Sequence, residues 1–401
     1  MTRATTFDWH PHAAVCLGSD ILSAVAFGAQ QGFRVIHDDG SHQALEDLCS
    51  AIKARAPFCV TDRTQDGLSA EQGELLTFTG GSTGAPKVIC RSQASWIASF
   101  EVNAGLFGFE PGMRVATLGA LSHSLTLYAV VEAIHLGLSA HVLAGLSATT
   151  QRRILDQKAV QILYTTPTQL KHLASGDPKT ALQHIRFILC GGGMLDEATR
   201  QIARRLCPHA TLHQFYGAAE TSFVTLTDAD TPAGSVGKAY PNVTLDLREG
   251  QVWVRSPYLF KGYANKHDAL LRDADGYVSV GELGTMDAQG NLWLTGRKDR
   301  LVQIADQTVS PEAVEQVIAA LCGSRHVAVL PVADAARGYR LVAVLEGHAD
   351  DTLAAKIRAT CQASFGSQIA PRRMLFRAEW PLLGSGKTDL ARLSQWLETR
   401  T

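Results

Sequence analysis

Apolar and polar positions alternate with two different periods over the first 215 residues of the chain. Short runs of β-branched or apolar residues indicate strands, and longer stretches with helical spacing separate them. The predicted strands are residues 33–37, 58–61, 115–118, 161–165 and 187–189, and the predicted helices are residues 44–55, 93–107, 124–136 and 196–206. Such alternation is typical of an α/β fold, in which helices cover the faces of parallel sheets.

The pattern changes near residue 234. Residues 237–263 and 276–294 contain short strands broken by Gly, Pro, Asn and Asp, which predicts a small antiparallel barrel or sheet. A mixed α/β pattern returns after Arg300, where Ser310 suits a helix N-cap and Pro311 the first helical turn. We expect a large domain of stacked β-sheets flanked by helices at 1–298, with a β-barrel-like subdomain at about 234–298, and a small α+β domain at 299–401.

Composition narrows the class of protein. Of the 401 residues, 46% are apolar and 19% charged, and the net charge of −1 gives no basic field for nucleic acid. No apolar run approaches the roughly 20 residues of a membrane span, and residues 1–11 do not resemble a secretion signal. None of the eight cysteines forms a CxxC pair, so neither a zinc site nor a disulfide framework is indicated. These features predict a cytoplasmic protein with reduced cysteines.

A glycine-rich segment is the first candidate for chemistry. A strand at 75–78 runs into Thr79-Gly80-Gly81-Ser82-Thr83-Gly84-Ala85-Pro86-Lys87, and we expect a helix after it. Its glycines let backbone amides turn towards an anion, and the hydroxyls and the ammonium add donors. A glycine-rich surface turn is the alternative. The segment is not a Walker A loop, because Pro86 precedes the lysine; residues 384–388 are not one either, because Pro381 stands where the first Walker glycine is needed.

Taken in order, the motifs resemble the acyl-adenylate-forming superfamily of acyl-CoA synthetases, stand-alone adenylation enzymes and luciferases. The resemblance covers the chain from about residue 30 to the C-terminus. It implies that the glycine-rich loop holds the β- and γ-phosphates of ATP. The loop residues implied to contact the nucleotide are Thr79, Gly80, Gly81, Ser82, Thr83, Gly84 and Lys87.

Three further motifs resemble the nucleotide and acyl sites of that family. In Leu121-Ser122-His123, the resemblance implies that His123 lines the acyl pocket. Residues 190–195 resemble a stretch whose backbone packs on adenine and the acyl chain. Residues 215–221 resemble one in which a Tyr lies by adenine and Glu220 holds Mg²⁺, a hard cation that needs a carboxylate. The remaining nucleotide contacts implied by these motifs are Gly191, Gly192, Gly193, Tyr216, Gly217, Ala218 and Ala219, the last where most members have Thr.

The last motifs lie in the second half of the chain. Glu282 stands where the family has an Asp that binds the ribose hydroxyls, and Arg297 matches an arginine near ribose and phosphate. Asp299 matches the hinge about which the family's C-terminal domain moves. Lys387 matches the family's catalytic lysine, whose ammonium would offset the negative charge concentrated as carboxylate and α-phosphate meet.

The resemblance predicts a ligase that uses ATP and Mg²⁺ to form an acyl-adenylate and then transfers the acyl group to CoA. Ala305 and Asp306 stand where thioester-forming members commonly have glycine, so a carrier-protein thiol or an amine remains the alternative acceptor. A protein that binds adenylate without turnover is a second alternative. The part before the glycine-rich loop is shorter than in typical members, which would open one side of the domain or create a homodimer surface.

The substrate prediction depends on a missing charge. Relatives that activate α-amino acids place an Asp beside the pocket, whereas Ser122-His123-Ser124-Leu125 contains no acid. A buried ammonium without a partner is costly. We therefore expect a carboxylic acid without an α-amine, either an aryl acid or a short to medium acyl acid.

Overall fold

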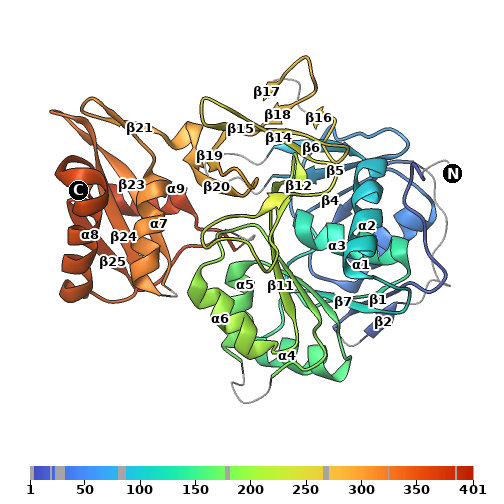
Figure 1. Ribbon diagram of the computed structural model, residues 1–401. Helices are drawn as coiled ribbons and strands as arrows, with labels where there is room; N and C mark the ends of the chain where they lie inside the picture. Colours follow the sequence, from blue (N-terminus) through green and yellow to red (C-terminus); the bar gives the residue numbers. More distant parts are fainter. Residues whose placement is uncertain are drawn as a thin grey trace.

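The computed structural model describes residues 4–18, 20–22, 32–79, 87–176, 181–264, 271–323, 325–383 and 386–400, which form four sheets and their covering helices (Figure 1). The largest sheet has nine strands in the order β13-β12-β11-β10-β9-β7-β8-β1-β2. Its central strands are parallel, while β2, β12 and β13 pair antiparallel at the edges. The strands are β1 Ala14–Leu17, β2 Asp20–Leu22, β7 Arg114–Thr117, β8 Ser139–Val142, β9 Ile162–Thr165, β10 Phe187–Cys190, β11 Thr211–Ala218, β12 Ser222–Leu226 and β13 Lys238–Ala239.

Helices cover both faces of this sheet, as its unbroken apolar strands require. Val115, Ile162 and Leu189 contribute to a core that includes α1, α2 and α3 and continues into a second sheet. Neighbouring residues such as Leu163 and Ile188 face the opposite core, which includes α4, α5 and α6. The helices are α1 His42–Lys53, α2 Gln93–Phe107, α3 Ser124–Leu136, α4 Ala148–Gln157, α5 Pro167–Ala174 and α6 Glu197–Leu206. The predicted α/β pattern is confirmed over this part of the chain.

The second sheet has five strands in the order β16-β6-β5-β4-β3. They are β3 Arg34–His37, β4 Phe58–Thr61, β5 Glu74–Phe78, β6 Val88–Ser92 and β16 Gly262–Tyr263. The helix expected after the glycine-rich loop is α2, which has the predicted bounds, but a strand precedes it: β5 and β6 are antiparallel neighbours, and the glycine-rich segment connects them. The apolar run Val88-Ile89-Cys90 extends the sheet.

The third sheet is antiparallel, as the sequence predicts for this region. Its strands are β14 Thr244–Arg248, β15 Gln251–Arg255, β17 Leu271–Arg272, β18 Val278–Ser279, β19 Glu282–Met286 and β20 Leu292–Arg297. The region is not self-contained, because β13 joins the nine-stranded sheet and β16 joins the five-stranded one. These two short strands attach the antiparallel sheet to the rest of the molecule.

The C-terminal part has its own sheet (Figure 1). It also has its own apolar cores. Its elements are β21 Val302–Ile304, β22 Gln307–Val309, α7 Pro311–Cys322, β23 Val327–Asp334, β24 Gly338–Glu346, α8 Asp351–Ile369, β25 Arg373–Arg377 and α9 Leu390–Glu398. The Ser310 hydroxyl accepts from the Ala313 amide and caps α7 as predicted. A 3-10 turn, η2 Lys298–Arg300, connects this part to β20. The domain boundary inside that turn stays a prediction.

Among the residues that the structure describes, no helix is both long and apolar enough to cross a membrane. The eight cysteines are all unpaired, and seven of them are buried.

Candidate active site

A cavity of about 270 Å³ opens beyond the carboxyl ends of the parallel strands, where β9 and β10 end at Thr165 and Cys190. Clefts at this edge are the usual ligand sites of open α/β sheets. The cavity collects predicted residues from distant parts of the chain, including Lys387 from the C-terminal part. The predicted residues that line it are Thr79, His123, Gly192, Gly217, Ala218, Ala219 and Lys387.

Two glycines shape one wall of this cavity. A Cβ atom on Gly191 would lie 2.2 Å from the ring of Phe215, so the glycine leaves the space that this ring occupies at the cavity. A Cβ atom on Gly217 would lie 1.8 Å from the carbonyl oxygen of Ser222, where β11 and β12 shift register. Gly193 lies next to Pro167, but it does not line the cavity. Gly191 therefore acts through packing, whereas a Cβ atom on Gly193 would make only ordinary contact with Pro167, at 3.6 Å.

Lys387 reaches the cavity on a short turn of the C-terminal part. Leu382 and Thr388 form a β-bridge, and the Leu383 amide donates to the Lys387 carbonyl at 2.8 Å. The Thr168 hydroxyl of α5 donates to the Gly386 carbonyl at 2.9 Å and ties the turn to the large domain. Burial lowers the pKa of the Lys387 ammonium, although the charges of Glu282 and Glu220 oppose that shift. Two predicted carboxylates therefore act on the predicted catalytic ammonium.

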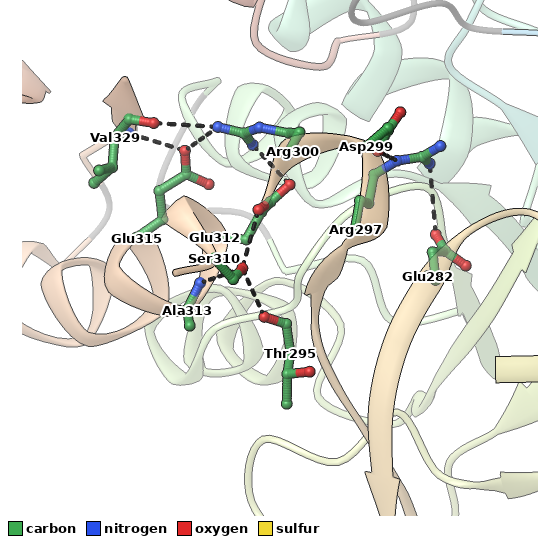
Figure 2. Close-up of polar contacts among 10 residues, drawn as sticks. All are labelled: Glu282, Thr295, Arg297, Asp299, Arg300, Ser310, Glu312, Ala313, Glu315 and Val329. Carbon is green, nitrogen blue, oxygen red and sulfur yellow. Dashed lines mark hydrogen bonds and ion pairs between the residues drawn. The ribbon is translucent and has the colours of Figure 1, made fainter. Parts of the chain in front are cut away.

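Glu282 is held by two other predicted residues. The Tyr216 hydroxyl donates to its carboxylate. An Arg297 nitrogen lies 3.9 Å from the other carboxylate oxygen (Figure 2). Burial raises the pKa of Glu282, while these two partners lower it. Tyr216, Glu282 and Arg297 thus form one cluster beside the cavity, whereas the sequence suggested three separate nucleotide contacts.

Glu220 lies at the end of a second cluster. The Tyr263 hydroxyl donates to its carboxylate at 3.0 Å, and the Lys87 ammonium lies 4.7 Å from the centre of the Tyr263 ring. Thr79 and Lys87 flank the glycine-rich loop, and a hydrogen bond joins them: the Thr79 amide donates to the Lys87 carbonyl at 3.0 Å. The predicted loop contacts Gly80, Gly81, Ser82, Thr83 and Gly84 lie outside the described residues.

Arg91 is a positioning residue that the sequence reasoning missed. This fully buried side chain donates to the carbonyls of Ala219 at 2.6 Å and Tyr258 at 2.5 Å. Burial lowers its pKa to about 10, against the opposing charge of Glu220. Arg91 thereby fixes the backbone that carries Glu220. The available signal was a single charge within the otherwise apolar segment Val88-Ile89-Cys90-Arg91.

His123 lies at the N-terminus of α3 and lines the cavity. The Asp38 carboxylate accepts from the Ser122 amide at 2.6 Å and holds this turn. Burial lowers the pKa of His123, although Asp38 and Asp62 raise it, which favours the neutral imidazole near pH 7. Asp62 also lines the cavity, paired with Arg63 at 3.2 Å. Residues 122–125 therefore contain no acid, whereas the cavity as a whole does contain one, Asp62.

The charged stretch around Asp299 is divided between the two parts of the chain. Arg297 donates to the Asp299 carboxylate at 3.1 Å, while Arg300 pairs with Glu312 at 3.0 Å and Glu315 at 3.1 Å (Figure 2). The pairs of Arg300 hold it against α7. Asp299 therefore stands between an arginine directed at the cavity side and one anchored in the C-terminal part. Its role as a hinge stays a prediction.

Comparison with known proteins identifies the class. The sequence model described as AMP-binding enzyme matches residues 21–264, more than half of the chain. The chain is 30% identical over 347 residues to the uncharacterized acyl-CoA ligase YhfT of Bacillus subtilis, covering 82% of this chain and 70% of that protein. It is 31% identical to the putative long chain fatty acid-CoA ligase VraA of Staphylococcus haemolyticus, covering 67% of this chain and 58% of that one.

Solved structures support the same fold. ATP-bound MatB from Rhodopseudomonas palustris matches with a TM-score of 0.80 at 18% identity, covering 97% of this chain and 96% of that one. The amide bond synthetase McbA from Marinactinospora thermotolerans matches with a TM-score of 0.75 at 20% identity, covering 96% of both chains. The chain belongs to the AMP-binding enzyme family, within the acyl-adenylate-forming superfamily. It is a ligase-type protein of that family.

Proposed function

We propose that this protein uses ATP and Mg²⁺ to convert a carboxylic acid into an acyl-adenylate and then transfers the acyl group to CoA. In the first step a carboxylate oxygen attacks the α-phosphorus of ATP, an oxygen–phosphorus bond forms, and pyrophosphate leaves. In the second step the sulfur of CoA, after losing its proton, attacks the acyl carbonyl and AMP leaves. The similarity to acyl-CoA ligases supports this assignment.

The observation that carries the proposal is the meeting of Lys387, Thr79 and the 217–219 backbone at one cavity. A triphosphate placed there has the Lys387 ammonium on one side and the ends of the glycine-rich loop on the other. Lys387 would donate to the α-phosphate and to the attacking carboxylate, offsetting the charge that accumulates between them. Holding the two reactants in line supplies the remainder of the catalysis.

The nucleotide would contact the clusters beside the cavity. We assign the adenine side to Tyr216 and the backbone of residues 191–193, and the ribose hydroxyls to Glu282 with Arg297 nearby. Tyr216 and Arg297 fix the Glu282 carboxylate before any ligand binds, which reduces the ordering cost.

The donor set fits Mg²⁺ brought in with the nucleotide. Within the described part of the chain, no group of three or more His, Cys, Asp or Glu side chains is arranged to hold a metal by itself. Mg²⁺ commonly binds through one or two carboxylates together with substrate phosphates and water. Glu220 would be that carboxylate, and the ion would neutralise charge on the phosphates. The Tyr263 hydroxyl and the Arg91-anchored backbone keep Glu220 in place.

We infer that the acid lacks an α-amine. Asp62 lines the cavity, but its carboxylate is already paired with Arg63, and burial keeps His123 largely neutral.

Domain motion about Asp299 belongs to the same proposal, with residues 299–401 moving as a unit after adenylation. The cytoplasm is the compartment in which ATP and CoA would be available.

An amine or a carrier-protein thiol is the alternative acceptor. Ala305 adopts φ of +56° in the turn between β21 and β22, a left-handed conformation that favours glycine. The side chains of Ala305 and Asp306 therefore occupy the turn where glycines would leave room for a pantetheine arm. The structural likeness to an amide bond synthetase favours the same alternative.

Acid-dependent exchange of pyrophosphate into ATP tests the first step. The purified chain, ATP, Mg²⁺ and a carboxylate panel should give exchange only with an accepted acid. Adding CoA, a phosphopantetheinylated carrier or an amine then identifies the acceptor by its product. If none of the acids in the panel supports exchange, the protein that binds adenylate without turnover is supported instead. If a thioester forms only on the carrier, CoA is excluded as the acceptor.

A further inference from the structure

The inner end of the cavity is built from aromatic rings. Trp96 of α2, Tyr128 of α3, Tyr164 of β9, Phe215 of β11 and Phe223 of β12 all line it. The ring centres of Trp96 and Tyr128 lie 5.3 Å apart in an edge-to-face arrangement, as do those of Tyr128 and Phe223. Rings in such arrangements present both edges and faces to a guest, which suits another aromatic ring.

The two tyrosines of this group face the cavity with their rings but not with their hydroxyls. The Tyr164 hydroxyl donates to the Glu132 carboxylate at 2.5 Å, and the Tyr128 hydroxyl lies 3.4 Å from the other oxygen of the same carboxylate. Glu132 has no exposed surface and does not line the cavity, so both hydroxyls point into the core. The Asn103 amide also donates to Glu132, at 2.7 Å.

This buried network holds the rings in place. Moving either ring would break its hydroxyl contacts and leave a buried carboxylate with fewer donors, which is strongly unfavourable. Behind the rings lies the main core rather than solvent: Phe100 packs edge-to-face on Tyr128 at 5.0 Å and is fully buried. The described residues at this end therefore form a closed wall of fixed position.

We propose that Glu132 is a positioning residue that fixes Tyr128 and Tyr164 as the end wall of the acyl cavity, and that the acid activated here is a compact aryl carboxylic acid. The inference rests on the proposed function for its reaction, but its claim about shape concerns binding alone. A single ring fits against the aromatic wall, whereas a long alkyl chain needs depth that the tied tyrosines deny. Neither the wall nor its anchor takes part in the chemical step.

The experiment compares benzoate, hexanoate and decanoate in two assays. Pyrophosphate exchange gives kcat/KM for each acid, and a thermal-shift titration without ATP reports binding alone. The wild-type protein should favour benzoate over decanoate at least tenfold. Tyr164→Leu should reduce this preference at least tenfold by deepening the cavity, and Tyr164→Phe should reduce it severalfold by releasing the ring from Glu132.

Tyr240→Phe is the matched control. The Tyr240 hydroxyl belongs to the same network through its 2.7 Å bond to Asn103, but Tyr240 does not line the cavity. This variant should lose stability while keeping the preference for benzoate. If it relaxes the preference as much as Tyr164→Phe does, the anchoring role of Glu132 is wrong.

The two assays separate the two proposals. Binding of benzoate without any exchange would reject the proposed function and leave the compact aryl pocket supported. A wild-type protein that prefers decanoate in either assay, or that fails to bind benzoate, overturns the inference. Exchange supported by decanoate would at the same time uphold adenylation itself.

Discussion

Burial lowers the pKa of the Lys387 ammonium, and this residue-level property leads to a pH prediction. The ammonium must be charged to offset the phosphates, so activity is lost as pH rises through its lowered pKa. In the free enzyme, kcat/KM for ATP should therefore fall on the alkaline side with an apparent pKa below the ordinary lysine value of about 10.4. An alkaline limb at or above that value would contradict the buried environment.

Replacing the same residue tests its role. Lys387→Ala should lower kcat for pyrophosphate exchange by about 10²- to 10³-fold, the usual effect of removing one preorganised donor. The dissociation constant for ATP, measured by calorimetry, should change little because the remaining contacts hold the nucleotide. Lys356→Ala, an exposed lysine on α8, is the control and should behave like the wild type.

The buried side chain of Glu132 makes the free energy of unfolding depend on pH. Burial raises its pKa to about 7, whereas the unfolded chain has the ordinary value of about 4.3. Between these two values the native state holds a proton that the unfolded state releases. The contribution of Glu132 to the free energy of unfolding is therefore present at low pH and lost as pH rises to about 7. Glu132→Gln should remove this dependence, so its free energy of unfolding should gain about 3 kcal/mol relative to the wild type between pH 4.5 and 7.

Chemical unfolding of both proteins over that pH range measures the difference. If the difference in the free energy of unfolding between Glu132→Gln and the wild type does not change with pH, the Glu132 carboxylate is ionised throughout.

At the scale of single residues, the sequence revealed which residues carry chemistry, through Glu220 and Lys387 in their motifs. It did not reveal Glu132, because a glutamate inside an apolar helix acquires its role only from partners on α2 and β9.

At the level of elements, the β11–β12 hairpin depends on one close approach. A Cβ at Gly217 would overlap the Ser222 carbonyl, so Gly217→Ala should displace the backbone that carries Ala218, Ala219 and Glu220. We expect a loss of about 2 kcal/mol in stability and a large loss of exchange activity. Gly105→Ala in α2 is the control: it meets no atom within 4 Å and should stabilise the protein by up to about 1 kcal/mol. Thermal unfolding and exchange assays of both variants give the comparison.

Several of the elements were predictable from the sequence. Helices 93–107 and 124–136 have the predicted bounds, and each ends at a glycine in the left-handed conformation, Gly108 and Gly137, which is a local stop signal. The strand that follows the glycine-rich loop, β6, was not predictable, because it is stabilised by pairing with β5 and β16. Pairing partners lie outside any local window of sequence, so periodicity alone does not reveal them.

For the whole molecule, the placement of Lys387 depends on a contact between the two parts of the chain. Thr168→Val removes the hydroxyl that donates to the Gly386 carbonyl. A single neutral hydrogen bond contributes about 1 kcal/mol, so kcat for exchange should fall about fivefold while ATP affinity is retained. Thr360→Val removes a similar hydroxyl-to-carbonyl bond on α8 and should leave kcat unchanged. An equal effect of both substitutions would point to general destabilisation.

The sequence by itself determined the class of fold, several of the helices and strands, and the motif residues, because residue type, period and order along the chain are local properties. The tertiary structure decided which of these residues meet. It joined Tyr216, Glu282 and Arg297 into one cluster, placed Lys387 at a cavity with Thr79, and tied the aromatic wall to Glu132. These are contacts between segments far apart in sequence, and their geometry follows from strand pairing and core packing.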